Sequence, residues 1–497
     1  MSSSRRDFLK TIGVLGGVSL LGHGTARGQA LGSMPNGYRF FRVLTANEEG
    51  TFNSFRNFLG NITGSVMMAS PLSDTGVGYV YLHGITNPRL DPPASPAVFM
   101  VVIDFTPIPP VVARVIPIAV EGRVLRGGSV TVGHIGTGAS NALGQYVTTI
   151  SLAERSETIA VDNSPGVYLF RPSSDIVGDW SRIIGFADPV PDGSFYGGDF
   201  GDVALDDDEN LLVAAATTQS PAATVSGFAG SQALIATSLG ATSSGRVVLQ
   251  TGDLLPFAPA VIESVGLIDL AAHHAFAAQL MTKRLDPNAT RSGTALIVGN
   301  TQRALGAQRV VAASAELVSS QVAARLQITS GQTFFGPRVD PHGDVAFVTH
   351  DGTFQPSIGS NAIEILSHYS RGLPHPLKQT QSSASSDAVI ALGAPCIDST
   401  GLIYGTQVLG DGTTQLFVSD GVNSQIVLRS GDRIPGRAPE GELAISEILF
   451  GQHPAQVDAF GRLAFAAEFL LNPSNPQDPN NQDPSNVITA LVIGIPR

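Results

Sequence analysis

The chain has 497 residues and a formal net charge of −12, with 43% hydrophobic residues, 14% charged residues, 55 glycines and 32 prolines. This composition is apolar enough to bury a large core and rich in turn residues, which excludes a generally disordered chain and favours a many-stranded protein. The acidic balance disfavours nucleic acid and anionic membrane surfaces as partners, because both would repel the protein.

The first element along the chain has the features of an export signal. Arg5-Arg6-Asp-Phe-Leu-Lys10 precedes an apolar run at 11–21 and the small-residue stretch Gly28-Gln-Ala30. This pattern resembles a twin-arginine signal peptide, which implies recognition by the export machinery and passage across the membrane in a folded state. The apolar run is about 11 residues, well short of the roughly 20 that span a bilayer. We therefore expect a signal peptide at 1–30, cleavage near Ala30, and release of residues 31–497 into the periplasm or outside the cell.

After this leader, one short pattern returns seven times at intervals of roughly 60 to 70 residues. A strand ends in a polar residue, a tight turn follows, and a second apolar strand begins, as in Asp340-Pro-His-Gly343-Asp-Val-Ala-Phe347. Asp or Asn opens such a turn by accepting a backbone amide two residues on, and Gly closes it with positive φ. The copies begin at Ser73, Asn141, Asp206, Asp269, Asp340, Asp398 and Asp458.

Each repeat continues with a third strand, and in most repeats a fourth strand follows, which runs into a Gly-Asp turn in its clearest copies, at Asp253 and Asp432. The last repeat stops after its third strand at 490–493, whereas a segment with the fourth-strand pattern, 40–47, precedes the first repeat. A ring that pairs its first strand with its last blade explains this permutation. We therefore predict an all-β fold, a seven-bladed β-propeller of four-stranded blades, closed by the N-terminal strand and forming one domain over 31–497.

The connections between second and third strands are the longest and most polar. One of them, 472–486, has too little apolar content to fold and is predicted to be a disordered loop. Connections from the same corner of every blade meet on one face of the ring, where we expect a ligand. Charged residues in these loops are the candidate ligand-face residues: Asp91, Arg284, Asp286, His350 and Asp351.

The repeat also resembles the tandem NxxGxxAF repeat of exported bacterial proteins of uncharacterised function, most literally at Asn141-Ala-Leu-Gly144 and Gly343-Asp-Val-Ala-Phe347. The resemblance covers residues 38–497, and the strand-turn-strand unit is also similar to NHL-type propeller blades. It implies a propeller and brings no catalytic residues. Members of that group often carry a C-terminal membrane anchor, whereas this chain stops at Arg497 without one, so we expect release rather than tethering.

Other candidate sites have weaker support. The acidic turn with Asp206, Asp207 and Asp208 offers oxygen ligands for calcium, but it lacks the EF-hand spacing, so a solvated acidic turn is the preferred interpretation and no cofactor is predicted. Cys396 is the only cysteine, which excludes an internal disulfide, and its apolar neighbours indicate a buried small side chain rather than a nucleophile. No serine-hydrolase, zinc-protease or phosphate-loop motif occurs.

Three functions are compatible with this sequence. The leading hypothesis is a binding or interaction scaffold of the cell envelope or the extracellular space, with a glycan, peptide or protein ligand. The alternative is a glycan-directed hydrolase or lyase that uses the non-repeated loop residues, for which paired carboxylates at a suitable separation would be required. A purely structural envelope component is the third.

Overall fold

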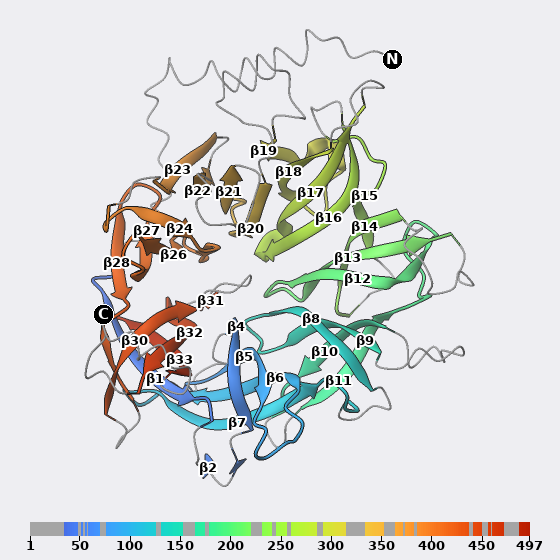
Figure 1. Ribbon diagram of the computed structural model, residues 1–497. Helices are drawn as coiled ribbons and strands as arrows, with labels where there is room; N and C mark the ends of the chain where they lie inside the picture. Colours follow the sequence, from blue (N-terminus) through green and yellow to red (C-terminus); the bar gives the residue numbers. More distant parts are fainter. Residues whose placement is uncertain are drawn as a thin grey trace.

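The chain forms a seven-bladed β-propeller in the computed structural model, which confirms the predicted fold (Figure 1). The structure describes residues 34–47, 51–52, 55–56, 58–69, 76–125, 131–152, 165–173, 178–219, 231–240, 245–255, 260–285, 292–314, 333–351, 363–370, 373–381, 385–436, 441–449, 456–458, 460–471 and 487–497. The predicted signal peptide at 1–30 and the predicted disordered loop at 472–486 lie outside these ranges. In the described part of the chain, no helix is long and apolar enough to cross a membrane.

Blades 1 to 5 are antiparallel four-stranded sheets in which the strands follow chain order from the inside of the ring to the outside. Blade 1 consists of β4 (Leu59–Ala69), β5 (Val77–Thr86), β6 (Pro96–Asp104) and β7 (Val111–Val120), and blade 2 of β8 (Val132–Ser140), β9 (Tyr146–Leu152), β10 (Gly166–Arg171) and β11 (Asp179–Gly185). Blade 3 consists of β12 (Phe195–Leu205), β13 (Asn210–Thr218), β14 (Ser231–Ser238) and β15 (Arg246–Gln250), and blade 4 of β16 (Ala260–Ala271), β17 (Ala275–Arg284), β18 (Ser292–Asn300) and β19 (Arg309–Ala313). Blade 5 consists of β20 (Thr333–Val339), β21 (Val345–Asp351), β22 (Ile363–Ser370) and β23 (Leu373–Gln379).

In blades 6 and 7 the inner strand is interrupted, so that two short segments pair with the same second strand. The strands of blade 6 are β24 (Val389–Leu392) with β25 (Cys396–Ile397), β26 (Ile403–Leu409), β27 (Thr414–Ser419) and β28 (Ser424–Arg429). Those of blade 7 are β30 (Glu442–Leu449) with β31 (Gln456–Val457), β32 (Leu463–Leu470), β33 (Val487–Pro496) and β1 (Tyr38–Thr45), with β29 (Arg433–Pro435) beside β30. The remaining described elements are the hairpin β2 (Thr51–Phe52) and β3 (Phe55–Arg56) and the 3₁₀ turns η5 (Ala272–His274) and η6 (Leu305–Ala307).

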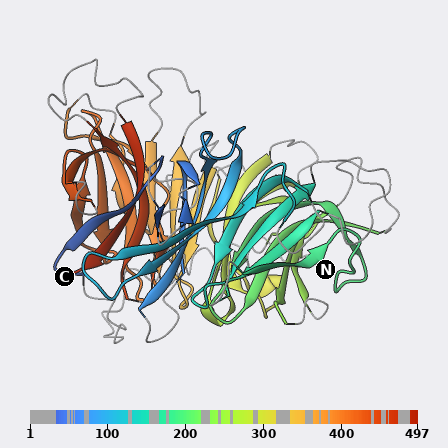
Figure 2. The same cartoon turned by 90° about the horizontal axis from the view of Figure 1, so that it is seen from below.

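The ring closes as predicted, because β1 is the outer strand of blade 7. It pairs antiparallel with β33 from Tyr38 opposite Pro496 to Thr45 opposite Ala490. Both views show the blue β1 beside the red strands of blade 7 (Figures 1 and 2). The chain therefore closes its ring by backbone hydrogen bonds between strands that are about 450 residues apart in sequence.

Hydrophobic side chains gather in seven clusters, one at each contact between neighbouring blades in the described structure. The cluster between blades 7 and 1 joins Leu44 of β1, Leu491 of β33 and Phe99 of β6. Since each blade packs on both faces, its middle strands are buried on both sides. This explains unbroken apolar runs such as 211–215 in β13.

The structure differs from the prediction at β23, whose strand pattern the sequence hides, and at the turn of blade 4, which begins two residues later than predicted. β23 contains Pro374 and Pro376, which hide its strand pattern but are tolerated because an outer edge strand need not donate every amide. Asp269 does not open a turn, because β16 continues to Ala271 and the turn is η5. In this turn His274 takes positive φ at the place where Gly343 does so in blade 5.

Candidate functional site

The inner strands of all seven blades end around one cavity of about 210 Å³ on the axis of the ring. This axial cavity is lined by the last residues of the inner strands and the first residues of the turns that follow: Met68, Gly138 to Ala142, Val203 to Asp207, Ile268 to Ala272, Arg338 to Pro341, Cys396 to Ser399, Val457 and Asp458. The cavity lies at the end of the ring that carries the turns between first and second strands, which we call the turn face. The ends of the second strands, from which the loops proposed to hold a ligand start, lie at the opposite end.

A second hollow, of about 440 Å³, runs on the outside of the ring between β1, β28 and β29. The residues that line it belong to blades 6 and 7 only, and they include Tyr38, Phe40 and Arg433. The axial cavity, in contrast, is the place where residues of every blade converge. For this reason the axial cavity is the better candidate site.

The recurring Asp or Asn side chain fastens five of the described turns in the way the sequence predicts, whereas Asp269 of blade 4 lies within β16 and does not. In the turns that open at Asn141, Asp206, Asp340, Asp398 and Asp458, one side-chain oxygen, Oδ1, accepts the backbone N–H groups two and four residues later. The distances lie between 2.7 Å for Asp206 and 3.2 Å for Asn141. The repeated carboxylate is thus part of the scaffold, and its place on the turn also sets it at the rim of the axial cavity.

The other carboxylate oxygen, Oδ2, has a different partner in each of blades 3, 6 and 7. It accepts from Asn210 Nδ2 at 2.8 Å in Asp206, from the Tyr404 hydroxyl at 3.2 Å in Asp398, and from Arg462 Nε at 2.6 Å in Asp458. In Asp340 no described residue donates to it. The residue four positions on is Asp344, whose carboxylate cannot donate.

Asp340 is buried, with 2% of its surface exposed. Burial is the main reason why the pKa of its carboxyl rises from 3.8 to about 6, and the negative charge of Asp344 adds to the rise. The backbone amides of Asp344 and His342 and the positive charge of the His342 side chain oppose this shift without cancelling it. A part of the Asp340 population therefore takes up a proton at mildly acidic pH.

We predict that Asp340→Asn changes how stability depends on pH. The folded protein holds the Asp340 proton more tightly than the unfolded chain, so this group stabilises the fold below about pH 4, and the contribution is lost as pH rises through about 6. Urea unfolding at several pH values is expected to show that the variant gains stability relative to the parent over this interval. Equal pH profiles for the two proteins would contradict the assignment.

Two further acidic side chains tie neighbouring inner strands together. Asp202 accepts from Thr137 Oγ1 at 2.7 Å in blade 2 and from the Ile268 amide at 3.0 Å in blade 4. Asp269 accepts from the Val339 amide at 2.8 Å and pairs with Arg338 Nη1 at 3.5 Å. Burial raises the pKa of both carboxyls, and Arg338 lowers each in part. These groups join blades 2 to 5, and Arg338 is the basic side chain that lines the cavity.

The calcium candidates lie at the turn of blade 3. Both oxygens of Asp206 already accept hydrogen bonds within the turn, and Asp207 Oδ1 accepts the Ala142 amide of blade 2 at 2.6 Å. Asp208 is exposed. Across the described ranges, no group of three or more His, Cys, Asp or Glu side chains is arranged to hold a metal ion.

The candidate loop residues are spread over the ring at its other end. Asp91 of blade 1 is buried and forms an ion pair with Arg123 of the connection to blade 2. Arg284 ends β17 in blade 4, whereas His350 and Asp351 end β21 in the next blade. Asp286 lies outside the described residues. The structure thus sets the blade 4 and blade 5 residues in neighbouring blades and Asp91 on the other side of the ring, and the enzymatic alternative stays a prediction.

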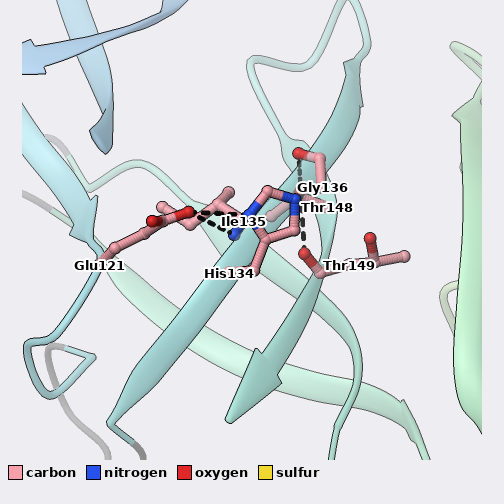
Figure 3. A network of polar contacts seen from close by, with 6 residues as sticks. All are labelled: Glu121, His134, Ile135, Gly136, Thr148 and Thr149. Carbon is pink, nitrogen blue, oxygen red and sulfur yellow. Dashed lines mark hydrogen bonds and ion pairs between the residues drawn. The ribbon is translucent and has the colours of Figure 1, made fainter. Parts of the chain in front are cut away.

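A polar network at the same end joins blades 1 and 2 (Figure 3). Glu121 Oε1 accepts from the Ile135 amide at 3.1 Å and contacts His134 Nδ1 at 3.0 Å, and the Thr148 hydroxyl donates to the Gly136 carbonyl at 2.8 Å. Figure 3 shows the Glu121 and His134 side chains pointing toward one another from the segment after β7 and from β8. The His134 side chain is 75% exposed, so the contact fastens a connection and does not enclose a site.

Cys396 is buried in the cluster between blades 6 and 7, as predicted. Burial raises the pKa of its thiol to about 12, so the thiolate that a nucleophile requires is scarce at neutral pH.

No family model matches this chain, and no curated protein sequence matches it. Among solved structures it is similar to the β-propeller domain of the Trilobed protease from Pyrococcus furiosus, with 10% identity, a TM-score of 0.40, and coverage of 82% of this chain and 95% of the other. It is also similar to an acylaminoacyl peptidase from Pyrococcus horikoshii, with 9% identity, a TM-score of 0.40, and coverage of 85% and 52%. A fucose-specific lectin from Aleuria aurantia matches with 11% identity, a TM-score of 0.31, and coverage of 74% and 95%. At these scores the likenesses carry no argument about the ligand or activity of this chain.

Proposed function

We propose that this protein is an exported binding scaffold that holds its ligand at the axial cavity of the turn face. The observation that carries the proposal is the convergence of all seven blades on this cavity. A ligand held there would contact residues that the whole closed ring positions, and the ring is rigid because each blade is packed on both faces.

The wall of the axial cavity is polar and predominantly acidic. Its carboxylates are Asp206, Asp207, Asp269, Asp340, Asp398 and Asp458, against the single guanidinium of Arg338. Carboxylates and backbone groups at the mouth of a narrow cavity favour ligands that bring hydrogen-bond donors, among which are peptides and glycans. Export through the twin-arginine pathway and release from the membrane belong to the same proposal, and they rest on the pattern at Arg5-Arg6.

A binding screen with glycans and peptides tests this proposal. The protein is produced with its leader and recovered from outside the cytoplasm, where N-terminal sequencing is expected to begin after Ala30. A ligand found for this protein is expected to lose at least about ten-fold in affinity when Ala142→Trp fills the cavity mouth, because the indole takes the space of the ligand.

The matched control for this experiment is Ala304→Trp, which places the same side chain at an exposed position that does not line the cavity. It is expected to bind as the parent does. A ligand whose affinity survives Ala142→Trp would place binding elsewhere on the propeller and contradict the assignment to the axial cavity.

A further inference from the structure

Comparison of equivalent turns singles out Asp340 among the residues at the cavity rim. At the fourth position after the turn residue, blades 2, 3 and 7 carry Gln145, Asn210 and Arg462, each of which is hydrogen-bonded to the turn side chain. Blade 6 supplies Tyr404 from two positions further on. Blade 5 has Asp344 instead, so the second oxygen of Asp340 receives no donor from the described structure.

This open oxygen belongs to a residue that is 98% buried and lines the axial cavity. A buried carboxylate without a full set of donors costs stability, and a folded protein retains such a group most readily where a ligand completes its hydrogen bonds. The missing partner is a donor, and a cationic one gains most because hydrogen bonds between ionised groups are the stronger ones.

The volume of the cavity restricts the size of the ligand. About 210 Å³ is below the roughly 300 to 1,000 Å³ of pockets for whole drug-sized molecules, but it accommodates one long side chain. A metal ion fits the wall less well than an ammonium or guanidinium group, because the described residues offer no cluster of three metal-ligating side chains.

The turns around the cavity also expose apolar side chains that a small cation would leave uncovered. Leu143 is 45% exposed and Phe460 is 65% exposed, and each stands two residues after the Asn or Asp that fastens its turn. Because Asn141 and Asp458 of the same turns line the cavity, a partner protein that inserted one side chain there would meet both turns. Arginine is enriched at protein interfaces and among the residues that carry most of the binding energy.

We propose that the axial cavity receives a lysine or arginine side chain of a partner protein, whose N–H group donates to Oδ2 of Asp340. This inference rests on the proposed function, because it names the partner of the same cavity. The neighbouring Asp269 is paired with Arg338, so it is a weaker acceptor for an incoming cation than Asp340.

The experiment uses residues 31–497 and an acetylated nonapeptide with a central lysine between leucine and phenylalanine, followed by isothermal titration calorimetry. The same peptide with glutamine in place of lysine is the matched neutral probe, and cadaverine and calcium chloride are the small-cation probes. The lysine peptide is expected to bind at least about ten-fold more tightly than the glutamine peptide and more tightly than cadaverine.

Three variants separate the possible causes. Asp340→Asn keeps the oxygen that fastens the turn and is expected to lose the preference for lysine while it stays folded by circular dichroism. Asp253→Asn removes one negative charge from a Gly-Asp turn outside the cavity and is expected to bind as the parent does. Ala142→Trp is expected to abolish binding of the lysine peptide.

Each of the other outcomes would refute one part of this proposal. Binding that is lost in Ala142→Trp but unchanged in Asp340→Asn would refute the role of Asp340 and leave the cavity as the binding site. Binding that is unchanged in both variants would refute the cavity as well. If cadaverine bound as tightly as the lysine peptide, the ligand would be a small amine and not a partner protein. If calcium bound more tightly than the peptide, the ligand would be a metal ion.

Discussion

Replacement of Leu44 by aspartate is expected to lower the free energy of unfolding by about 4 kcal/mol or more and to open the ring. Leu44 is 1% exposed on β1, lies opposite Leu491 of β33, and belongs to the cluster between blades 7 and 1. The substitution removes a buried apolar side chain and introduces a carboxylate without a partner, and each change alone destabilises by several kcal/mol.

Because Leu44 lies on the strand that closes the ring, this loss of stability is expected to open the ring between blades 7 and 1. β1 leads into the segment that precedes blade 1, and its pairing with β33 makes it part of blade 7. When β1 leaves β33, the contact between blades 7 and 1 opens, and the apolar surfaces of both blades meet water. Urea unfolding measures the stability, and amide hydrogen exchange is expected to become faster first in β1 and β33.

Arg39→Asp is the matched control, because it places the same residue at an exposed position of the same strand. It is expected to change the free energy of unfolding by less than about 1 kcal/mol. A Leu44→Asp protein that kept the stability of this control would show that the ring does not depend on the β1 closure.

Most of this fold could be predicted from the sequence because a propeller repeats the same local units. Turn residues at fixed offsets marked seven hairpins, and the displaced fourth strand at 40–47 indicated a closed ring. Local sequence patterns did not predict the strand or turn correctly where the position of a strand in the ring determines its structure. The prolines of β23 are tolerated at an outer edge, and β16 extends past Asp269 because the 3₁₀ turn η5 closes the hairpin two residues later.

The site was less predictable for a physical reason. The sequence predicted the role of Asp206, Asp340, Asp398 and Asp458 in their turns, but a repeat period does not tell which ends of the strands face a cavity. The gathering of these residues on the axis, and the ties made by Asp202 and Asp269, depend on contacts between residues about 65 or more positions apart. One signal for the special position of Asp340 was present in the sequence, because only blade 5 has a second carboxylate four residues after its turn aspartate.

The second large effect is expected at Asp458, where Asp458→Asn should lower the free energy of unfolding by about 3 kcal/mol. Asp458 Oδ2 accepts from Arg462 Nε at 2.6 Å, and Arg462 Nη2 contacts the same oxygen. The Arg462 guanidinium is held between the rings of Phe105 of blade 1 and Phe460, at 4.0 and 4.8 Å from their centroids. Removal of one partner of a buried ion pair costs about 3 to 5 kcal/mol, because the other charge stays buried without compensation.

The same substitution at the equivalent position of blade 5 is expected to have the opposite sign. Asn retains Oδ1 in both turns, so the backbone amides keep their acceptor. At Asp458 the new amide group faces a guanidinium, and two donors oppose one another. At Asp340 the new amide group faces Asp344 and removes the repulsion between two carboxylates, so at pH 7 the Asp340→Asn protein is expected to be more stable than the parent.

A double-mutant cycle isolates the term at Asp458. Arg462→Met removes the buried charge and keeps much of the side-chain volume between the two rings. The double variant Asp458→Asn with Arg462→Met is therefore expected to be less destabilised than the sum of the two single changes, with a coupling of about 1 to 3 kcal/mol by urea unfolding. Additive losses would mean that Arg462 and Asp458 stabilise the contact of blades 7 and 1 independently. In that case the opposite effects of Asp→Asn on stability at positions 458 and 340 would be explained by the open oxygen of Asp340 alone.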